Sequence, residues 1–344
     1  MMFWVQTNKK RGMKLALTGI IAMTLLLSAC GNNNSNNASN ANASTNASPT
    51  ASAEATAAPA ETAAPAEAKT VTDAMGHQVT VPANPQRVLA SYLEDYLVTL
   101  GVTPVAQWSV TNGIQDYLAP ALKDVPTISY DLPLEAVTSF APDFHIVQSE
   151  GTVQNGLYDQ LNKIAPTYVL GDEISKDWRA SLRKIGELLN KSDAAEKAIA
   201  DYDQKAADAK AKLTSAVGEQ SVAILWLVQK NFYIVDNTRA SGAVLYGDLG
   251  LQLPNLVTEI PEASRATWNP ITLEKLAELT ADHIFLVNSD KAQGSDVLNS
   301  AIWKGIPAVK AGHVYEMSAA SSWLYSGAYA NNLTIDDALA NLVK

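Results

Sequence analysis

The chain has 344 residues, and its 25 Lys and Arg side chains stand against 35 Asp and Glu side chains, a net charge of −10. This acidic balance argues against a nucleic acid or an anionic lipid surface as the partner, because both bind through a positive field. With a single cysteine no internal disulfide can form, so the fold must be stabilised by its hydrophobic core.

The N-terminal segment has the parts of a secretory signal. A basic run precedes an apolar stretch over residues 15–29, which is too short to span a bilayer as a mature helix. The only cysteine, Cys30, directly follows Leu-Ser-Ala, and this junction resembles the lipobox of bacterial lipoproteins. The resemblance implies that residues 1–29 are removed, whether translation starts at Met1 or Met13, and that the cysteine is lipidated. A free thiol after an ordinary signal is the alternative.

Residues 30–69 differ in composition from the rest of the chain. They are dominated by Asn, Ser, Ala, Thr, Pro and Glu and contain no aromatic or large aliphatic residue. Such a segment buries too little apolar surface to offset the entropy of ordering it, so we expect a flexible tether behind the lipid anchor.

From residue 70 onward the pattern changes to strands alternating with helices. A hairpin with its turn over residues 73–77 opens this region. Strands are expected over residues 87–90, near 105, near 127, over 144–148 and over 168–170, and helices over 93–100, 117–122, 134–140 and 157–165. This alternation predicts a parallel, helix-covered sheet, and we assign residues 70–190 to an N-terminal lobe.

A long helical region follows. After a helix over residues 178–189, apolar residues recur at steps of three and four on one helix face, at Ile199, Tyr202, Ala206, Ala209 and Leu213. We expect a single helix over residues 191–216 that acts as a brace between two parts of the protein.

The C-terminal lobe is expected to comprise residues 217–344, where the alternation resumes. Strands are expected over residues 222–228, 232–235, 283–287 and 313–317, and helices over 242–249, 273–279, near 297–303 and over 334–343.

One motif occurs in both halves. Glu135 opens a helix and Asp143 precedes a strand eight residues later; Glu274 and Asp282 repeat this arrangement. A helix–Asp–strand unit present once in each half indicates two α/β lobes of similar construction.

Several segments together resemble the siderophore and cobalamin class of binding proteins that serve ABC importers. The resemblance covers residues 70–344 and rests on Val71-Thr72-Asp73 with Gly76, Val79, Val81-Pro82, Pro85 and Arg87-Val88, on Leu100-Gly101-Val102, Pro142-Asp143 and Leu249-Gly250-Leu251, and on Trp303 with Ile306-Pro307-Ala308-Val309-Lys310, Gly312 and Val314-Tyr315. It implies two Rossmann-like lobes joined by a single long helix, with the ligand in the cleft between them.

The resemblance also gives the repeated glutamates a role. By position, Glu135 and Glu274 match residues that dock into arginine pockets on the two halves of a dimeric permease, whose ATPase is on other chains. Arg–carboxylate pairs suit such docking because they can be bidentate. Alternatively, each glutamate only stabilises the N-terminus of its helix.

Ligand contacts are expected on loops at the carboxyl ends of strands, facing the cleft. The candidate residues from both lobes are Trp108, Asn112, Tyr130, Ser149, Trp178, Arg179, Trp226, Arg239, Arg265, Trp268, Trp323 and Tyr325. The segment around Trp323 and Tyr325, and Trp268, are similar to family stretches that touch hydroxamate siderophores.

A ferric hydroxamate or mixed siderophore is the favoured cargo, with iron present only inside the bound complex and no cofactor. Aromatic walls suit its aliphatic shell, and one or two arginines suit the iron-bound oxygens. A triply negative catecholate complex would need several converging cations, and Arg179, Arg239 and Arg265 keep this alternative open.

Other classes fit the sequence less well. It shows no phosphate loop, nucleophile elbow or paired acid–base set, which argues against an enzyme. The histidines His77, His145, His283 and His313 are isolated, which argues against a bare-metal site, and His145 and His283 occupy corresponding places in the repeats. Cobalamin, haem bound through Tyr325, and a surface sensor lipoprotein remain alternatives. We expect a monomer on the outer face of the cell membrane, in a Gram-positive bacterium.

Overall fold

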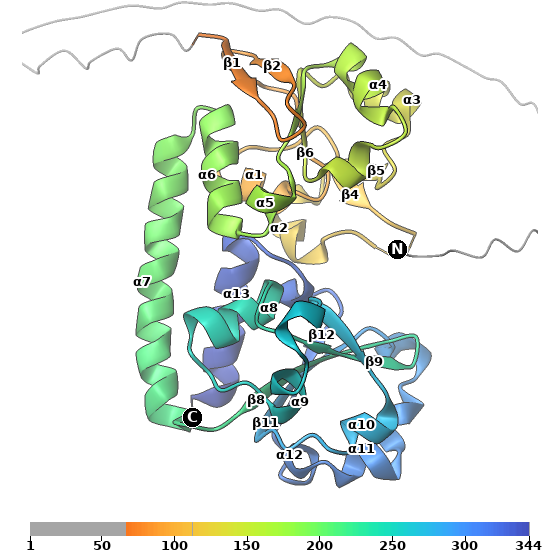
Figure 1. Cartoon of the computed structure of the whole chain (residues 1–344), viewed down its shortest axis with the longest axis vertical. Coiled ribbons are helices and arrows are strands. Elements are labelled where there is room, and N and C mark those ends of the chain that lie inside the picture. The colour runs from red at the N-terminus through yellow and green to blue at the C-terminus, as the bar shows by residue number, and fades with distance from the viewer. Residues whose placement is uncertain (1–66, 112, 344) are drawn as a thin grey trace, which may run out of the picture. The chain divides into compact units, whose positions relative to one another are not determined.

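The computed structural model describes residues 67–111 and 113–343, which belong to one compact unit. Within this unit the chain forms two α/β lobes and passes between them once, in helix α7 (Ser192–Val217) (Figure 1). The expected signal, the lipidation site at Cys30 and most of the tether lie outside the described residues.

The N lobe opens with an antiparallel hairpin of β1 (Lys69–Thr72) and β2 (Gln78–Val81), so its first strand begins at the last residue of the expected tether, one residue before the expected start of the lobe. The turn is closed by the Asp73 carboxylate, which accepts hydrogen bonds from the backbone N–H groups of Met75 and His77. The remaining strands form two parallel sheets, β3-β6-β7 and β4-β5. Their bounds are β3 (Val88–Leu89), β4 (Gln107–Ser109), β5 (Thr127–Ser129), β6 (Phe144–Val147) and β7 (Thr167–Val169).

Helices connect these strands, as the alternation predicts. They are α1 (Glu94–Thr99), α2 (Ala119–Leu122), α3 (Leu134–Ser139), α4 (Leu157–Ile164), α5 (Asp172–Ser175) and α6 (Trp178–Leu188). Helix α6 begins where the Asp177 carboxylate accepts the N–H groups of Arg179 and Ala180, an N-cap that satisfies two otherwise unpaired donors.

The C lobe contains a five-stranded sheet in the order β10-β9-β8-β11-β12. Its strands are β8 (Val222–Val228), β9 (Asn231–Val235), β10 (Trp268–Ile271), β11 (His283–Asn288) and β12 (Val314–Ser318). β8, β11 and β12 are parallel, whereas β9 and β10 add an antiparallel flange. Strand β10 is not predicted from the sequence because it contains Pro270. A proline lacks the N–H that a central strand needs, but an edge strand tolerates it.

The helices of the C lobe are short, apart from the last. They are α8 (Ala240–Gly242), continued by the π-helix η3 (Ala243–Asp248), α9 (Asn255–Thr258), α10 (Leu273–Leu276), α11 (Ala301–Gly305), α12 (Pro307–Lys310) and α13 (Ala328–Leu342). At the start of η3 only a glycine fits, because a Cβ on Gly242 would lie 1.6 Å from the carbonyl oxygen of Asp236.

Helix α13 begins six residues before the predicted start at residue 334. The cause lies in the other lobe. The buried carboxylate of Asp95, in α1, accepts the N–H groups of Tyr329 and Ala330 and so caps the first turn of α13. A Cβ on Gly327, where φ is 147°, would lie 2.1 Å from this carboxylate. The helix start therefore depends on a contact between the lobes that periodicity does not reveal.

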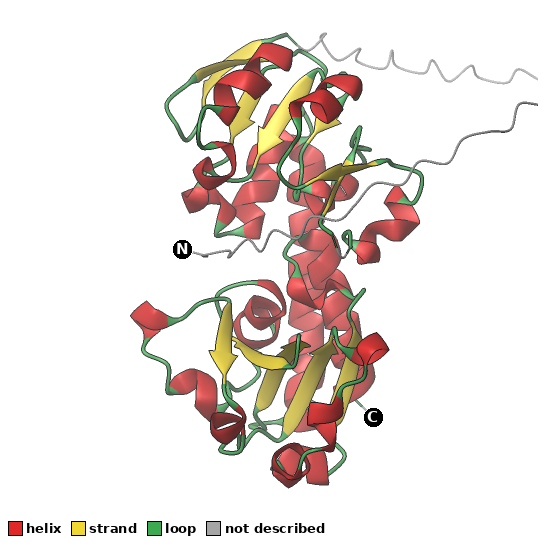
Figure 2. Ribbon diagram, turned by 90° about the vertical axis from the view of Figure 1, so that its right-hand side faces the viewer, coloured by secondary structure: helices red, strands yellow, loops and turns green. Residues whose placement is uncertain are grey.

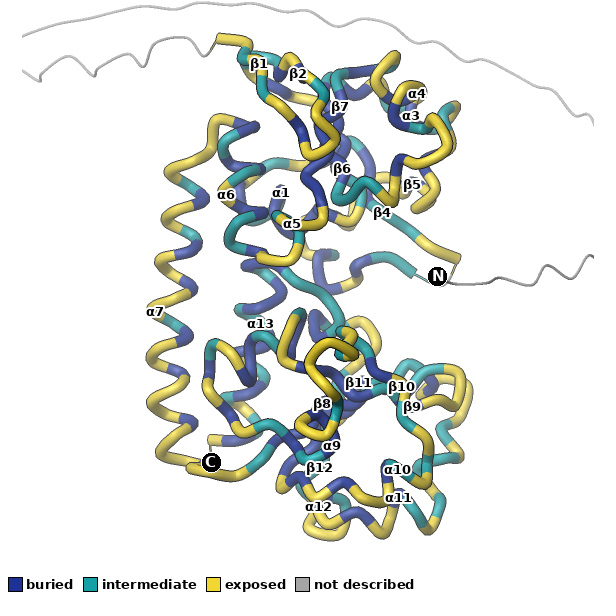
Figure 3. Tube along the Cα trace, in the orientation of Figure 1, coloured by how far each residue is buried: buried dark blue, intermediate teal, exposed yellow. Residues whose placement is uncertain are grey.

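The largest hydrophobic core is shared by the two lobes. It includes Phe144 from the N lobe, Phe285 from the C lobe and Tyr202 from α7, all fully buried. Figure 3 shows that α7 turns its buried residues toward the lobes and its exposed residues away from them. Figure 2 shows helices running between the strands of one lobe and those of the other. Each lobe also has a smaller core of its own on its outer side.

The repeated aspartates occupy equivalent places in the two lobes. Asp143, just before β6, accepts the backbone N–H groups of Gln86 and Arg87 at 2.7 and 3.0 Å, just before β3. Asp282, just before β11, accepts the N–H of Ser221 at 2.8 Å, just before β8. In each lobe the aspartate thus ties the start of one strand to the start of its parallel neighbour.

The histidine prediction needs two corrections. When the aspartates are matched, His145 corresponds to Ile284 rather than to His283, so the two histidines are one position out of register. The histidines are also not all isolated, since the rings of His283 and His313 stack with their centroids 4.8 Å apart. His145 is buried, and burial lowers its pKa to about 4, which keeps the ring neutral.

Candidate ligand-binding cleft

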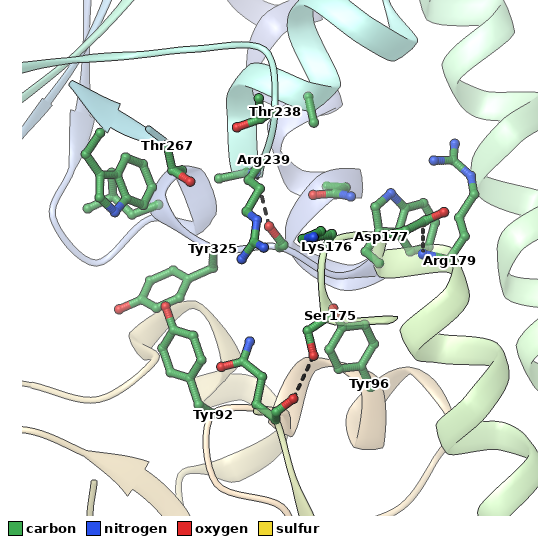
Figure 4. A pocket seen from close by; sticks show the side chains of 18 of the residues that line it. Tyr92, Tyr96, Ser175, Lys176, Asp177, Arg179, Thr238, Arg239, Thr267 and Tyr325 are labelled. Carbon is green, nitrogen blue, oxygen red and sulfur yellow. Dashed lines mark hydrogen bonds between the residues drawn. The ribbon is translucent and has the colours of Figure 1, made fainter. Parts of the chain in front are cut away.

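Loops at the carboxyl ends of the strands line a cavity of about 370 Å³ between the lobes (Figure 4). The N lobe contributes Tyr92 and Gln148 from the loops after β3 and β6, together with residues 175–179, which run from the end of α5 into the first turn of α6. The C lobe contributes Arg239 after β9, Trp268 at the start of β10 and Tyr325 after β12, with Thr238, Thr267 and Ser326 beside them. This is where the ligand of an open α/β sheet is expected, because the strand ends present loop side chains and free backbone groups.

A second cavity of about 540 Å³ adjoins the first on the N lobe. It shares Tyr92 and Gln148 with the first cavity. Its other lining residues come from the loops after β3, β4, β5 and β6, and they are Ser91, Trp108, Tyr130, Asp131, Ser149, Gly151, Thr152, Gln154, Asn155 and Leu157.

The cations that line the first cavity differ in how far they are neutralised. Arg179 forms ion pairs with Asp203 and Asp248, at 2.6 and 3.2 Å. Lys176 pairs with Glu173. Arg239 forms no ion pair within the part of the chain that the structure describes, and Figure 4 shows its guanidinium directed into the cavity while Arg179 extends toward α7. The cavity therefore offers one cation whose charge is free to meet a ligand.

Aromatic rings form a row across the cleft. The ring of Tyr92 meets the ring of Trp108 edge-on, with 5.0 Å between centroids, and lies 6.2 Å from the ring of Tyr325. On the C-lobe side Trp268 packs edge-on against Trp226 at 5.6 Å. Rings held by neighbouring rings give a rigid apolar surface that can contact a ligand at little entropic loss.

Two buried carboxyl groups lie directly behind this row. Glu94 accepts the backbone N–H of Trp108 at 2.6 Å, and its other oxygen has no partner among the described residues. Burial raises the pKa of Glu94 to about 7 and that of Asp95 to about 6. Glu94 thus fixes the backbone beside a cleft tryptophan, and its burial favours the protonated form.

The candidate ligand residues fall into three groups. Eight of them line one of the two cavities, namely Trp178, Arg179, Arg239, Trp268 and Tyr325 in the first and Trp108, Tyr130 and Ser149 in the second. Three of them line neither cavity, namely Trp226, Arg265 and Trp323. Asn112 lies outside the described residues.

The expected contacts at Trp323 and Arg265 do not agree with their positions. Trp323 is 0% exposed, stacks on Phe285 and donates its indole N–H to Asp337, so it is a core residue. Arg265 donates to the carbonyl of Ile260 outside the cavity, so it does not converge with Arg179 and Arg239.

Trp226 lines neither cavity, but it packs against Trp268, which lines the first. Its indole N–H donates to Ser289 at 3.0 Å, and its ring packs on Trp268. Trp178 lines the cavity with little of its surface, because it is 8% exposed and packs edge-on against Tyr202.

Sequence reasoning missed Tyr92 and Gln148, which both cavities share. Gln148 directly follows β6, although the sequence places it in the strand expected over residues 144–148, and Tyr92 comes three residues after β3. The rule that ligands meet strand ends points to both places.

The two repeated glutamates lie outside the cleft. Glu135 and Glu274 are exposed, and each is the second residue of a helix, α3 and α10. Neither forms an ion pair with any residue that the structure describes. The neighbouring Lys275 pairs with Glu259 and Glu278 instead. Hydrogen bonds from its own backbone and from Thr272 lower the pKa of Glu274, so it stays ionised.

This fold and cleft agree with a known family. Residues 90–320 match the family model described as periplasmic binding protein. The chain belongs to this family. Its members are solute-binding proteins rather than enzymes.

Relatives of this periplasmic binding protein cover most of its length. The Iron(3+)-hydroxamate-binding protein FhuD of Bacillus subtilis is 31% identical over 298 residues, 85% of each chain. The probable siderophore-binding lipoprotein YfiY of the same organism is 27% identical over 285 residues, 78% of this chain and 86% of its own.

A solved structure shares the fold. It is a FhuD-fold periplasmic binding component of a Fep/Fec-like ferrichrome ABC transporter from Bacillus subtilis, with a TM-score of 0.67 and 26% identity, and the match covers 80% of this chain and all of that one. In the described residues of this periplasmic binding protein, no helix is long and apolar enough to cross a membrane, and no three His, Cys, Asp or Glu side chains are grouped to hold a metal ion.

Proposed function

We propose that this protein captures an iron(III)–siderophore complex outside the cell and delivers it to an ABC permease. The observation that carries the proposal is the cleft between the lobes, with its aromatic row and its single unpaired guanidinium, Arg239. It is supported by relatives that are themselves iron(3+)-hydroxamate-binding and siderophore-binding proteins.

A hydroxamate or mixed siderophore is the favoured cargo. A ferric trishydroxamate carries little net charge, so one arginine bonded to its iron-bound oxygens suffices, and rings can cover its aliphatic shell. A triply charged catecholate complex calls for several free cations, whereas Arg179 and Lys176 are already paired. The proposed contacts are Arg239, Trp268, Tyr325, Trp108, Tyr130, Ser149 and, at the edge, Arg179 and Trp178.

Haem and cobalamin are less well supported as cargo. Haem binding through Tyr325 would require its phenolate, and burial raises the pKa of Tyr325 to about 12. The iron of the cargo is part of the bound complex, and the proposal includes no cofactor.

Glu135 and Glu274 are proposed to dock the loaded protein on the permease. Both carboxylates are exposed and unpaired within the described residues, and they occupy equivalent helices on two lobes of similar construction. A pair related in this way can meet the two halves of a dimeric permease, with bidentate arginine contacts at each end.

Lipidation at Cys30 is proposed to hold the protein, as a monomer, on the outer face of a Gram-positive cell membrane. Metabolic labelling with a palmitate analogue tests it. We expect label on the wild-type chain and none on Cys30→Ser, which should appear in the culture medium. Equal labelling of both would contradict the anchor.

The cargo is tested by intrinsic tryptophan fluorescence of the purified chain without its signal. The panel contains ferrioxamine B, ferrichrome, ferric citrate, a ferric catecholate, haem and cobalamin. We expect saturable quenching by a ferric hydroxamate, because Trp108 and Trp268 line the cleft.

Two controls separate binding from light absorption. The same quencher should have little effect on free tryptophan, and the gallium complex of the same siderophore, which has the same shape, should compete with the iron complex. Indifference to every ferric chelate would refute the proposed function.

A further inference from the structure

Tyr92 stands between the two cavities of the cleft. It lines both of them, while most other lining residues belong to only one. The first cavity contains the free guanidinium of Arg239. The second has Asp131 as the only charged residue in its described lining and is otherwise built mainly from aromatic, amide and hydroxyl side chains, with Leu157 and Gly151. The two compartments on either side of Tyr92 therefore differ in chemistry.

Contacts on both sides hold the Tyr92 ring. Trp108 of the N lobe meets it edge-on at 5.0 Å, and Tyr325 of the C lobe lies 6.2 Å away. Tyr325 in turn packs against Tyr117, at 5.1 Å. Figure 4 shows Tyr92 and Tyr325 side by side below Arg239. The ring thus completes an aromatic row that reaches from one lobe to the other.

The backbone of Tyr92 is strained. Its φ is 69°, in the left-handed region that a bulky residue rarely adopts. Such a conformation persists only where the surroundings fix it, and strained residues cluster at binding sites. Here Leu93 donates its N–H to the carbonyl of Ala90 in a tight turn, and Glu94 holds the backbone of Trp108. The turn after β3 aims the tyrosine at the cleft and limits its movement.

The volumes of the two cavities support a role for Tyr92 in selecting ligands by size. Binding sites for small molecules span about 300–1,000 Å³. The first cavity, about 370 Å³, lies at the lower end of that range, whereas the two cavities joined would lie near its upper end. Tyr92, together with Gln148, lies where these two volumes meet, and it contributes the only ring at that boundary among the described lining residues.

We propose that Tyr92 is a specificity-determining residue that divides the cleft and selects chelates by size. This inference rests on the proposed function. The compact iron–oxygen centre binds in the compartment of Arg239. Bulky parts of the organic ligand reach the second compartment only past Tyr92, so the ring disfavours large chelates.

The test compares two probes of the same iron chemistry and different size. Ferric tris(acetohydroxamate), kept intact by excess acetohydroxamic acid, has no connecting backbone, whereas ferrioxamine B has a long one. Dissociation constants for both are measured by fluorescence quenching on wild type, Tyr92→Ala and Tyr92→Phe. We expect Tyr92→Ala to shift the ratio of the two affinities toward ferrioxamine B by about tenfold, a modest effect for an aromatic side chain at a binding surface. Tyr92→Phe, which keeps the ring, should stay within about twofold of wild type.

Two further variants sharpen the result. Tyr92→Gly also removes the ring and accepts the positive φ, so it replaces the alanine variant should that one fail to fold. Tyr130→Ala changes an exposed ring of the second compartment only, and we expect it to weaken ferrioxamine B without improving access.

The outcomes are distinct. An unchanged ratio in Tyr92→Ala and Tyr92→Gly, or a shift toward the small probe, would overturn the role of Tyr92 while leaving the proposed function standing. If wild type itself binds no ferric chelate, the proposed function fails and this inference fails with it.

Discussion

The two lobes are alike on their outer sides and different on the sides that face the cleft. Outside, each lobe has an exposed glutamate in a short helix and an aspartate, Asp143 or Asp282, that ties two parallel strands together at their starts. Inside, the N lobe presents mainly rings, amides and hydroxyls, and its cations Lys176 and Arg179 are already paired, whereas the C lobe presents a free guanidinium and a tryptophan on an antiparallel flange.

This difference corresponds to two kinds of partner. A permease of two similar halves calls for two similar docking surfaces, so the outer units can resemble each other. A chelate between the lobes has no such symmetry, and the two walls that hold it can diverge. The predictions below test each side of this contrast.

The largest expected effect is the loss of iron uptake when the exposed glutamates on the outer sides of the lobes are replaced. Replacing both Glu135 and Glu274 with alanine should abolish uptake of the iron complex by whole cells, because each lobe loses its contact with the permease. Binding measured on the purified variant should remain within about twofold of wild type, since neither residue lines the cleft. Each single variant should lower uptake by a similar amount; normal uptake in the double variant would refute the docking role and favour a sensor.

Two tryptophans that were both expected to contact the ligand should differ when each is replaced by alanine. Loss of one should mainly lower stability, and loss of the other should mainly weaken binding. Trp323→Ala should lower the free energy of unfolding by about 3–5 kcal/mol, because it empties a fully buried site and strands its partner Asp337. Trp268→Ala should instead weaken cargo binding with a smaller loss of stability. Chemical denaturation and fluorescence titration of both variants separate the two effects. A stable Trp323→Ala that binds weakly would show that Trp323 contacts the ligand after all.

The arginines of the C lobe provide the next comparison. Arg239→Ala should weaken binding of a ferric hydroxamate by about 30- to 100-fold, as expected for a charged hydrogen bond lost in a cleft. Arg265→Ala should change the affinity by less than about twofold, because Arg265 lies outside both cavities. Isothermal titration calorimetry on the two variants measures this contrast. Equal losses would mean that the binding surface extends to Arg265.

The smallest expected effect is on the pH dependence of stability, through Glu94 of the N lobe. Glu94 has a pKa of about 7 in the folded protein against an ordinary value near 4.5, so the folded state holds a proton that the unfolded state releases. Stability from this group is therefore present below about pH 4.5 and is lost as pH rises to about 7.

Glu94→Gln removes this loss because glutamine does not titrate. The stability of the variant relative to wild type should rise by about 2–3 kcal/mol between pH 4.5 and pH 8, measured by urea denaturation. Taking the difference between the proteins cancels the opposite contribution of His145, whose lowered pKa removes stability as the pH falls. A difference that does not vary with pH would mean that Glu94 is not desolvated.

Much of the fold follows from local patterns in the sequence. The bridging helix was predicted to within one residue of α7 at each end, because its apolar face repeats over many turns. Strand β10 was not predicted because it contains Pro270, and proline is unfavourable in most strand positions. The early start of α13 was not predicted because its cap, Asp95, is more than 230 residues away in the chain.

The site was predicted less completely for a related reason. Position after a strand correctly indicates a place near the cleft for Ser149 and Arg239, whereas Trp108 lies within β4. Such a position does not say which way a side chain turns, and this is decided by tertiary packing, as for Trp323, which stacks on Phe285. Trp323 and Tyr325 are two residues apart, yet one is in the core and the other lines the cavity. The resemblance to the family predicted that both residues contact the ligand.

The hydrophobic core that both lobes share through α7 and α13 has a consequence for how the molecule comes apart. A lobe produced alone would expose the apolar faces of these helices, so half-molecules should aggregate rather than fold. Thermal denaturation should then appear in a calorimeter as one cooperative transition, with the enthalpy expected of the whole body, and not as two successive peaks.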